Sequence, residues 1–231
     1  MIGFYDYTVI LTYLSLLSAG AGIIISLSGT GHPYIGTFFL LFCGLCDAFD
    51  GRVARTKDNR TDMEKAFGIQ IDSLSDLVAF GVLPACIGSA MIRTSSVLQA
   101  LFVPHHFDAL HVLHWVFNAL LVLYILAALI RLAYFNVTEE ERQKTEGGTR
   151  KYYLGLPVTS AALIFPAVMM MQYMLPMDIS VIYFPVILVT GLLFITPIKV
   201  PKPGLKGILI MIGIGLLEFL VMLMMHLFFR R

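Results

Sequence analysis

Four aspartates lie close together in an otherwise apolar stretch between residues 45 and 80. Asp47 and Asp50 are three residues apart, so in a helix they would share one face. Asp72 and Asp76 are four residues apart and would share a face in the same way. Carboxylates within apolar helices are costly and usually mark a functional site. Four neighbouring anions also need a positive partner to offset their mutual repulsion.

Divalent cations would supply that positive charge, because Mg²⁺, Mn²⁺ and Ca²⁺ prefer carboxylate oxygens. Two facing pairs of aspartates would suit two ions and the chemistry of phosphate groups. Gly51, Ala54 and Gly68 are small and would allow a helix or a bulky ligand to approach closely. Arg55 can bind phosphate through two parallel hydrogen bonds. These residues indicate a metal-dependent diphosphate site; the alternative is a charged loop whose aspartates pair with neighbouring basic residues.

The composition indicates which elements position these residues. The 231 residues are 58% hydrophobic and 13% charged, with a mean hydropathy of +0.83. Soluble domains are about 45–50% apolar and about 25% charged. The apolar runs reach the length of about 20 residues that a helix needs to cross a bilayer. The chain is therefore predicted to be a single-domain (1–231), all-α polytopic membrane protein, and its net charge of +1 gives no indication of a nucleic-acid partner.

Seven apolar segments separated by turn signals are expected to form the membrane helices. The first is predicted to be a retained span, because no basic region precedes it as in a signal peptide. The charged run at residues 139–153 is expected to be a solvated loop. The seven segments cover about 8–28, 33–51, 69–92, 111–136, 156–175, 179–197 and 205–229.

Basic residues are distributed unevenly between the two sides of this arrangement. Thirteen of the 16 Lys and Arg residues lie in or next to the connections after the second, fourth and sixth segments. The positive-inside rule places these connections in the cytoplasm. The aspartates flank one of these connections, so the predicted site faces the cytoplasm from within the cell membrane.

The aspartate stretch resembles the signature of the CDP-alcohol phosphotransferases, D-x-x-D-G-x-x-A-R followed by G-x-x-x-D-x-x-x-D. Residues 47–55 match the first half and residues 68–76 the second, at every fixed position. The twelve-residue spacer between the halves is longer than usual in the family. The stretches "FGIQIDSLSDLVAFGVLPA", "RLAYFN" and "GLPVTSAALIFP" are similar to the serine branch of the family, the CDP-diacylglycerol–serine phosphatidyltransferases. The resemblance covers about residues 8–197 and implies a six-helix core, with the segment at 205–229 as an additional seventh.

This resemblance implies transfer of a phosphatidyl group from CDP-diacylglycerol to the hydroxyl of L-serine, with release of CMP. It also implies a divalent metal cofactor, with two ions of Mg²⁺ or Mn²⁺ bound. The same resemblance implies a homodimer in the membrane. The roles carried over are metal ligation by Asp47, Asp50, Asp72 and Asp76, proton abstraction by Asp76, and CDP binding by Gly51, Ala54, Arg55 and Gly68.

The acceptor alcohol is less well specified. The carboxylate of serine should meet a cation, for which Arg131 and Lys151 are candidates. Arg131 could equally be an anchor at the membrane interface. Acceptors such as glycerol 3-phosphate or inositol phosphate stay open on charge alone, so the choice of serine rests on the resemblance. Asn136 could cap a helix or bind the acceptor, and it is interpreted as a helix cap.

Other polar residues are interpreted without a role in this chemistry. Cys43, Cys46 and Cys86 are expected to be buried thiols. Histidines at 105, 106, 111 and 114 are expected at the opposite membrane interface. Glu218 could face an oligomer partner or a lipid headgroup.

Two other classes of protein also use acidic membrane helices. An aromatic prenyltransferase would carry its two acidic motifs in widely separated halves of a longer chain, whereas these four aspartates fall within thirty residues. A divalent-cation transporter would hold its ion near the bilayer midplane, on broken or repeated helices. No such repeat is evident in the sequence.

Overall fold

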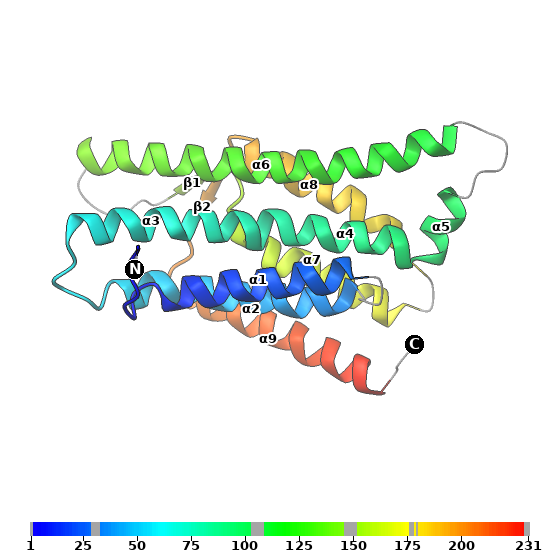
Figure 1. Ribbon diagram of the computed structural model, residues 1–231, viewed down its shortest axis with the longest axis horizontal. Helices are drawn as coiled ribbons and strands as arrows, with labels where there is room; N and C mark the ends of the chain where they lie inside the picture. Colours follow the sequence, from blue (N-terminus) through cyan, green and yellow to red (C-terminus); the bar gives the residue numbers. More distant parts are fainter. Residues whose placement is uncertain are drawn as a thin grey trace.

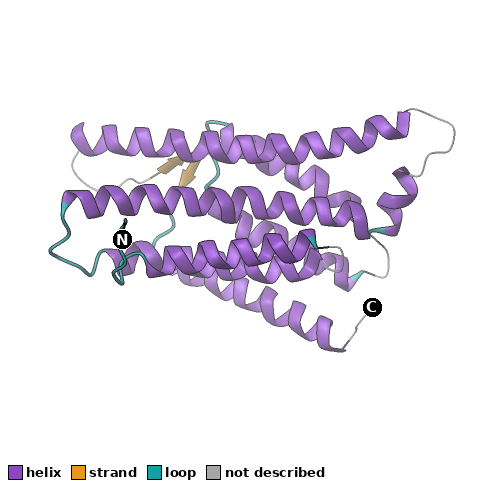
Figure 2. Ribbon diagram, viewed as in Figure 1, coloured by secondary structure: helices purple, strands orange, loops and turns teal. Residues whose placement is uncertain are grey.

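The structure, a computed structural model, is nearly all helix (Figure 2). It describes residues 2–28, 33–102, 109–145, 152–175, 178 and 180–228. The helices are α1 (Ile10–Leu27), α2 (Pro33–Ala54), α3 (Asp62–Asp76), α4 (Leu83–Thr94), α5 (Ser96–Phe102), α6 (Ala109–Thr145), α7 (Ala161–Met174), α8 (Tyr183–Ile195) and α9 (Leu205–Phe228). A π-helical turn (Leu77–Val82), two 3-10 turns (Val158–Ser160 and Ser180–Ile182) and strands β1 (Tyr152–Leu154) and β2 (Lys199–Pro201) complete the described elements.

The helices confirm the predicted fold class, a polytopic α-helical membrane protein. Two shorter apolar helices, Val158–Gln172 and Ser180–Ile195, accompany the long ones, so all seven predicted apolar segments are helical in the described residues. The helices that are long and apolar enough to cross a membrane are, within the described ranges, Ile10–Leu27, Pro33–Ala54, Asp62–Thr94, Leu113–Arg142 and Leu205–Met225.

The two ends of the bundle differ in what they carry. The N-terminus, the start of α3, the β1–β2 pair and the end of α6 lie towards the left of Figure 1, and the C-terminus lies at the right. The left end therefore holds the connections in which the sequence concentrates its basic residues, and α2 ends there, a turn after its aspartates.

Helices α3 and α6 both extend further than the sequence analysis predicts. Helix α3 begins at Asp62 rather than at 69, because Thr61 and Glu64 form a capping box in which each side chain accepts from the other residue's backbone N–H. Helix α6 runs to Thr145, so the prediction of a loop from 139 was wrong. Ion pairs one turn apart, such as Glu139–Arg142 at 2.6 Å, stabilise this polar end as helix.

The helix that carries Asp72 continues through a π-helical turn into α4. Pro84 has no N–H to donate to the carbonyl four residues earlier, that of Phe80. The buried hydroxyl of Tyr124 from α6 donates to this carbonyl at 2.6 Å. The Tyr183 hydroxyl donates to the Pro84 carbonyl at 2.8 Å. Two buried tyrosines thus stabilise the irregular part of the helix.

Small residues allow α1, α2 and α7 to pack closely. A Cβ on Gly22 of α1 would lie 2.9 Å from the Cβ of Phe39, and a Cβ on Gly44 of α2 would lie 2.5 Å from the Cβ of Ala162. Contacts this short exclude any side chain, so the helices meet through glycine. This packing fixes α2, and with it the first pair of aspartates, against α1 and α7.

Strands β1 and β2 form a short antiparallel pair that the sequence analysis did not predict. Tyr152 pairs with Pro201 and Leu154 pairs with Lys199. The pair joins the connection before α7 to the connection before α9. Three residues per strand are too few for an alternating apolar pattern to be recognised in the sequence.

Helix α9 lies at the outer edge of the bundle, where it is coloured orange to red in Figure 1. Only 11% of the residues in its apolar, membrane-spanning stretch are buried inside the bundle. It contacts α2 and α7, for instance through the rings of Phe38 and Phe219, whose centroids are 5.4 Å apart. The prediction that this helix lies outside a six-helix core stays a prediction.

Candidate active site

Three of the four aspartates form a cluster between α2 and α3. Asp47, Asp50 and Asp72 each place one carboxylate oxygen within 4.8 Å of the others. All three side chains are half-buried. The antiparallel approach of α2 and α3 therefore brings together the two acidic pairs that the sequence separates by more than twenty residues.

Asp76 lies one helical turn further into the bundle than Asp72. It is the most buried of the four aspartates, with 8% of its surface exposed. It is not part of the three-carboxylate group. Its predicted roles as base and as additional metal ligand stay predictions.

The donor set of this cluster fits a hard divalent cation. Three carboxylates offer oxygen ligands, which Mg²⁺ and Mn²⁺ prefer, and none of the three is a soft sulfur ligand. Like charges this close repel strongly in a half-buried setting. A cation between them would offset this repulsion, so the residues present fit the metal that the sequence analysis predicts.

Helix α1 supplies contacts to both acidic helices. The Thr12 hydroxyl lies 3.5 Å from Oδ2 of Asp50, and the Ser75 hydroxyl donates to the Thr12 carbonyl at 3.1 Å. Sequence analysis did not single out Thr12. A signal was present, because α1 buries hydroxyl residues on one face at Thr12, Ser15, Ser18 and Ser26.

Two of the predicted nucleotide-binding residues, Gly51 and Arg55, lie together at the end of α2. The guanidinium nitrogens of Arg55 are both 3.8 Å from the position that a Cβ on Gly51 would take. Arg55 therefore folds back along the helix over Gly51, next to Asp50 in sequence. Its side chain is exposed.

The other two predicted nucleotide-binding residues meet through a residue that sequence analysis did not single out. The Arg60 side chain donates to the Ala54 carbonyl at 3.4 Å. Its Nη2 lies 2.6 Å from the position of a Cβ on Gly68. Ala54 and Gly68, the last residue of α2 and a residue in α3, are thus brought together by this arginine.

Asn136 is not a helix cap, so that prediction was wrong. It lies well inside α6, which continues to Thr145. Its side-chain amide donates to the Ser73 hydroxyl at 2.7 Å. Because Ser73 follows Asp72, this hydrogen bond fixes α6 against the acidic face of α3.

The two predicted acceptor-binding residues differ in what the structure shows. Arg131 is buried, with 6% of its surface exposed. Its Nε donates to the Leu156 carbonyl at 3.2 Å, and its guanidinium carbon lies 5.2 Å from the centre of the Phe135 ring. Such burial does not agree with a snorkelling interface anchor. Lys151 lies outside the described residues.

A cluster of charges outside the membrane helices ties the N-terminal segment to the connection between α2 and α3. The Lys57 ammonium lies 2.5 Å from Asp6 and 2.6 Å from Glu64. The hydrogen bonds from Lys57 and Thr8 lower the pKa of Asp6 from 3.8 to about 2. This cluster anchors the N-terminal segment to the start of α3.

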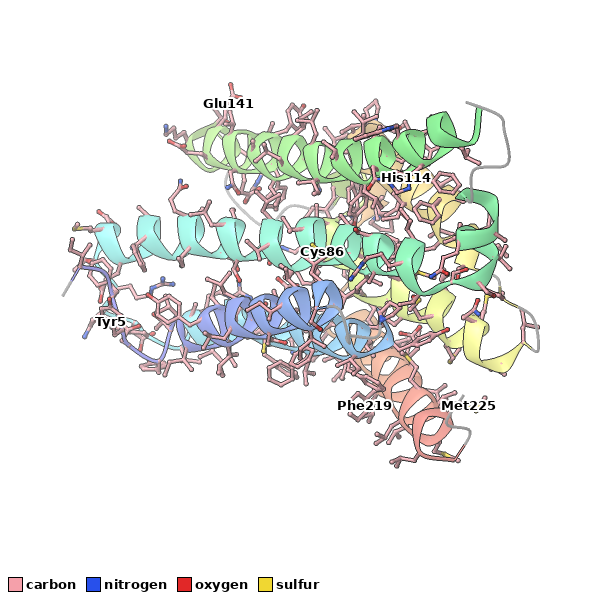
Figure 3. The ribbon with its side chains drawn as sticks, turned by 45° about the vertical axis from the view of Figure 1, so that its right-hand side comes forward. Tyr5, Cys86, His114, Glu141, Phe219 and Met225 are labelled. Carbon is pink, nitrogen blue, oxygen red and sulfur yellow. The ribbon has the colours of Figure 1, made fainter. Side chains whose placement is uncertain are left out.

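The remaining polar residues have no part in the cluster. The described cysteines are free, with Cys43 and Cys46 buried. His114 contacts Asn118 at the start of α6, the opposite end from Glu141 (Figure 3). The other three predicted interface histidines have no described side chains. Glu218 is buried within the bundle, so its side chain faces neither an oligomer partner nor a lipid headgroup.

The comparison with protein families agrees with this geometry. A model described as CDP-alcohol phosphatidyltransferase matches residues 8–196. The chain belongs to this family. The matched region ends before β2 and α9.

Curated relatives fall within one branch of the family. A CDP-diacylglycerol–serine O-phosphatidyltransferase of Saccharomyces cerevisiae is 36% identical over 142 residues, which are 60% of this chain and 43% of the relative. One of Helicobacter pylori is 25% identical over 177 residues, 75% and 63% of the two chains. An archaetidylserine synthase of Methanothermobacter thermautotrophicus is 33% identical over 151 residues, 65% and 53%. The matched parts span about half of these longer relatives.

Proposed function

We propose that this protein transfers the phosphatidyl group of CDP-diacylglycerol to the hydroxyl of L-serine and releases CMP. The observation that carries the proposal is the cluster of Asp47, Asp50 and Asp72, with Asp76 one turn deeper. The family to which the chain belongs, and the names of its relatives, support the serine branch.

In this proposal the three clustered aspartates hold Mg²⁺ or Mn²⁺, with two ions bound. The bound metal would neutralise the diphosphate and the charge that develops on the leaving CMP. Arg55, beside Gly51 at the exposed end of α2, would bind the diphosphate through its planar guanidinium. The aspartates fix where the diphosphate lies relative to the buried Asp76.

Asp76 would take the proton from the serine hydroxyl, whose oxygen attacks the phosphorus next to diacylglycerol. Its burial restricts access to water, which favours attack by the alcohol over hydrolysis. Ser75 ties the adjacent backbone to α1, so the direction of the carboxylate is fixed by the helix rather than by a loop.

Arg131 is the favoured cation for the serine carboxylate. It lies five residues from Asn136 on α6, about 7.5 Å along the axis. Asn136 is level with Ser73, and Asp76 lies about 4.5 Å beyond Ser73 in the same direction. Arg131 and Asp76 therefore have similar depths. Lys151 stays a second candidate from the sequence.

The site is proposed to face the cytoplasm from the cell membrane. The basic connections gather at the same end of the bundle as the aspartates, which supports this orientation. A transporter site would lie near the bilayer midplane, whereas Asp50 is one turn from the end of α2. The homodimer implied by the resemblance stays part of the proposal, and light scattering of the purified protein in detergent would measure it.

Release of CMP by the purified protein in detergent tests this function. CDP-diacylglycerol and Mg²⁺ or Mn²⁺ would be supplied with serine, glycerol 3-phosphate, inositol phosphate or no acceptor. Release should require serine and metal, and Asp76→Asn should abolish it. Asp58→Asn, an exposed aspartate in the neighbouring connection, is the matched control and should stay active. Release with another acceptor alone would overturn the choice of serine.

A further inference from the structure

Arg60 lies in the connection between α2 and α3, within the spacer that is longer than usual in the family. Its side chain turns back towards both helices. Nη1 donates to the Ala54 carbonyl at 3.4 Å, and Nη2 donates to the Glu64 carbonyl at 3.2 Å. The same Nη2 occupies the space beside Gly68, where a Cβ would meet it at 2.6 Å.

These contacts satisfy the guanidinium poorly. Both hydrogen bonds are long and reach neutral carbonyls, whereas arginine binds most strongly to anions. Nε is buried and has no hydrogen-bond partner within the described residues. The carboxylate of Glu64, whose carbonyl Arg60 contacts, is bound by Lys57 and by the backbone N–H of Thr61. An anionic ligand would therefore stabilise the partly buried guanidinium of Arg60.

The position of Arg60 relates it directly to the aspartates. Ala54 follows Asp50 by four residues on α2, and Gly68 precedes Asp72 by four on α3. Residues four apart lie on the same helix face, about 6 Å along the axis. Arg60 therefore joins the two helices one turn outside the three-carboxylate cluster, on the side away from Asp76.

CDP-diacylglycerol, the substrate of the proposed function, must bind between α2 and α3 in one orientation. Its acyl chains stay in the hydrocarbon, so its polar nucleotide must point out of the membrane. With the diphosphate at the aspartates, the nucleotide half lies one turn outward, at the level of Gly68 and Arg60. A phosphate there can replace the two long bonds to carbonyls by shorter, charge-assisted ones.

We propose that Arg60 binds the phosphate on the cytidine side of the diphosphate and so holds the CMP half of the substrate. This inference rests on the proposed function and adds to it a binding residue contributed by the long spacer. The guanidinium lies against Gly68, so a side chain at this position would displace it.

Binding of CMP and of cytidine to the purified protein, measured calorimetrically with Mn²⁺ present, tests the proposal. Cytidine lacks the phosphate, so it separates the arginine contact from contacts to the base. Arg60→Ala and Arg60→Gln should each weaken CMP binding about tenfold to a hundredfold, the usual effect of losing a charge-assisted bond. Cytidine binding should not change. Arg60→Lys should fall between, because it keeps the charge and loses the planar fork.

Lys65→Ala is the matched control, since Lys65 is an exposed cation of the neighbouring helix α3 that pairs with Asp62. It should bind CMP like the unaltered protein. Equal loss of CMP and cytidine binding in both Arg60 variants would mean that Arg60 only braces the helices, and would overturn the proposal. Unchanged CMP binding, or no CMP binding by the unaltered protein, would overturn it too. CMP binding that depends on Arg60 without transfer to serine would instead refute the proposed function alone.

Discussion

Replacing Gly155 by alanine should destabilise the protein and displace Arg131. Gly155 joins β1 to the connection before α7, with φ at +77°, in the left-handed region that favours glycine. Its N–H donates to the Ile198 carbonyl at 2.8 Å, so its orientation is fixed. A Cβ here would lie 2.5 Å from the Phe194 carbonyl oxygen and 3.3 Å from Nε of Arg131.

Two costs add up in this variant. A left-handed conformation costs a residue with a Cβ about 1–2 kcal/mol. The overlap with the Phe194 carbonyl forces a shift of backbone, and overpacking of this kind costs about 1–3 kcal/mol. The free energy of unfolding should therefore fall by about 2–5 kcal/mol, or roughly 5–15 °C in the unfolding midpoint.

Thermal unfolding in detergent measures this effect, with Gly204→Ala as the matched control. Gly204 lies in the connection before α9 and has nothing within 4 Å of its Cβ position, so its replacement should change the midpoint little. Transfer activity would be measured on the same samples below the midpoint. The Gly155 variant should show a raised KM for serine, because Arg131 must move.

Equal midpoints for the two variants would refute the reasoning about the backbone at Gly155. A lowered midpoint with an unchanged KM for serine would leave the stability argument intact and remove the support for Arg131 as the acceptor-binding residue. Arg131→Lys would then be expected to retain the same KM.

Three further outcomes are expected. Asp72→Asn should weaken Mn²⁺ binding, measured by calorimetry, by at least about a hundredfold, since even the partners of metal ligands are worth about 10–100-fold; equal affinity would remove Asp72 from the metal site. The lowered pKa of Asp6 contributes stability above pH 4 that is lost as the pH falls towards 2. Asp6→Asn should therefore lower the unfolding midpoint at pH 6 and have little effect near pH 2, and a difference that does not depend on pH would contradict this. Asn136→Ala, which removes the bond to Ser73, should lower the free energy of unfolding by about 0.5–1.5 kcal/mol; denaturant unfolding measures this, and no change would show that the bond contributes nothing.

The aspartates could be located from sequence because their spacing and their apolar setting are both unusual. The pairs at three and four residues define helix faces, and the cost of charge in such helices demands a partner. The approach of Asp47, Asp50 and Asp72 needs only that α2 and α3 be antiparallel neighbours, which a short connection makes natural. This part of the site therefore follows from local rules.

Contacts that depend on side chains crossing between elements could not be predicted in this way. Thr12 reaches Asp50 from α1, and Arg60 reaches Gly68 from a connection, and neither pairing has a fixed spacing. Asn136 was misinterpreted because the end of α6 was placed too early. The capping box at Thr61 and Glu64 was, by contrast, readable from the sequence and would have placed the start of α3 correctly.

The π-helical turn at Leu77–Val82 divides the long helix through α3 and α4 into two arms that can open separately. The wide turn and the missing amide of Pro84 interrupt the series of backbone hydrogen bonds along this helix. Local opening that begins in α3, which carries the aspartates, should therefore stop at the turn, and hydrogen exchange would detect this. Helix α4, the arm after the turn, keeps its protection, because Tyr183 binds the Pro84 carbonyl at its start and Tyr124 binds the Phe80 carbonyl within the turn. Amides before the turn should then exchange faster without substrate and slow on binding, while those after it stay unchanged.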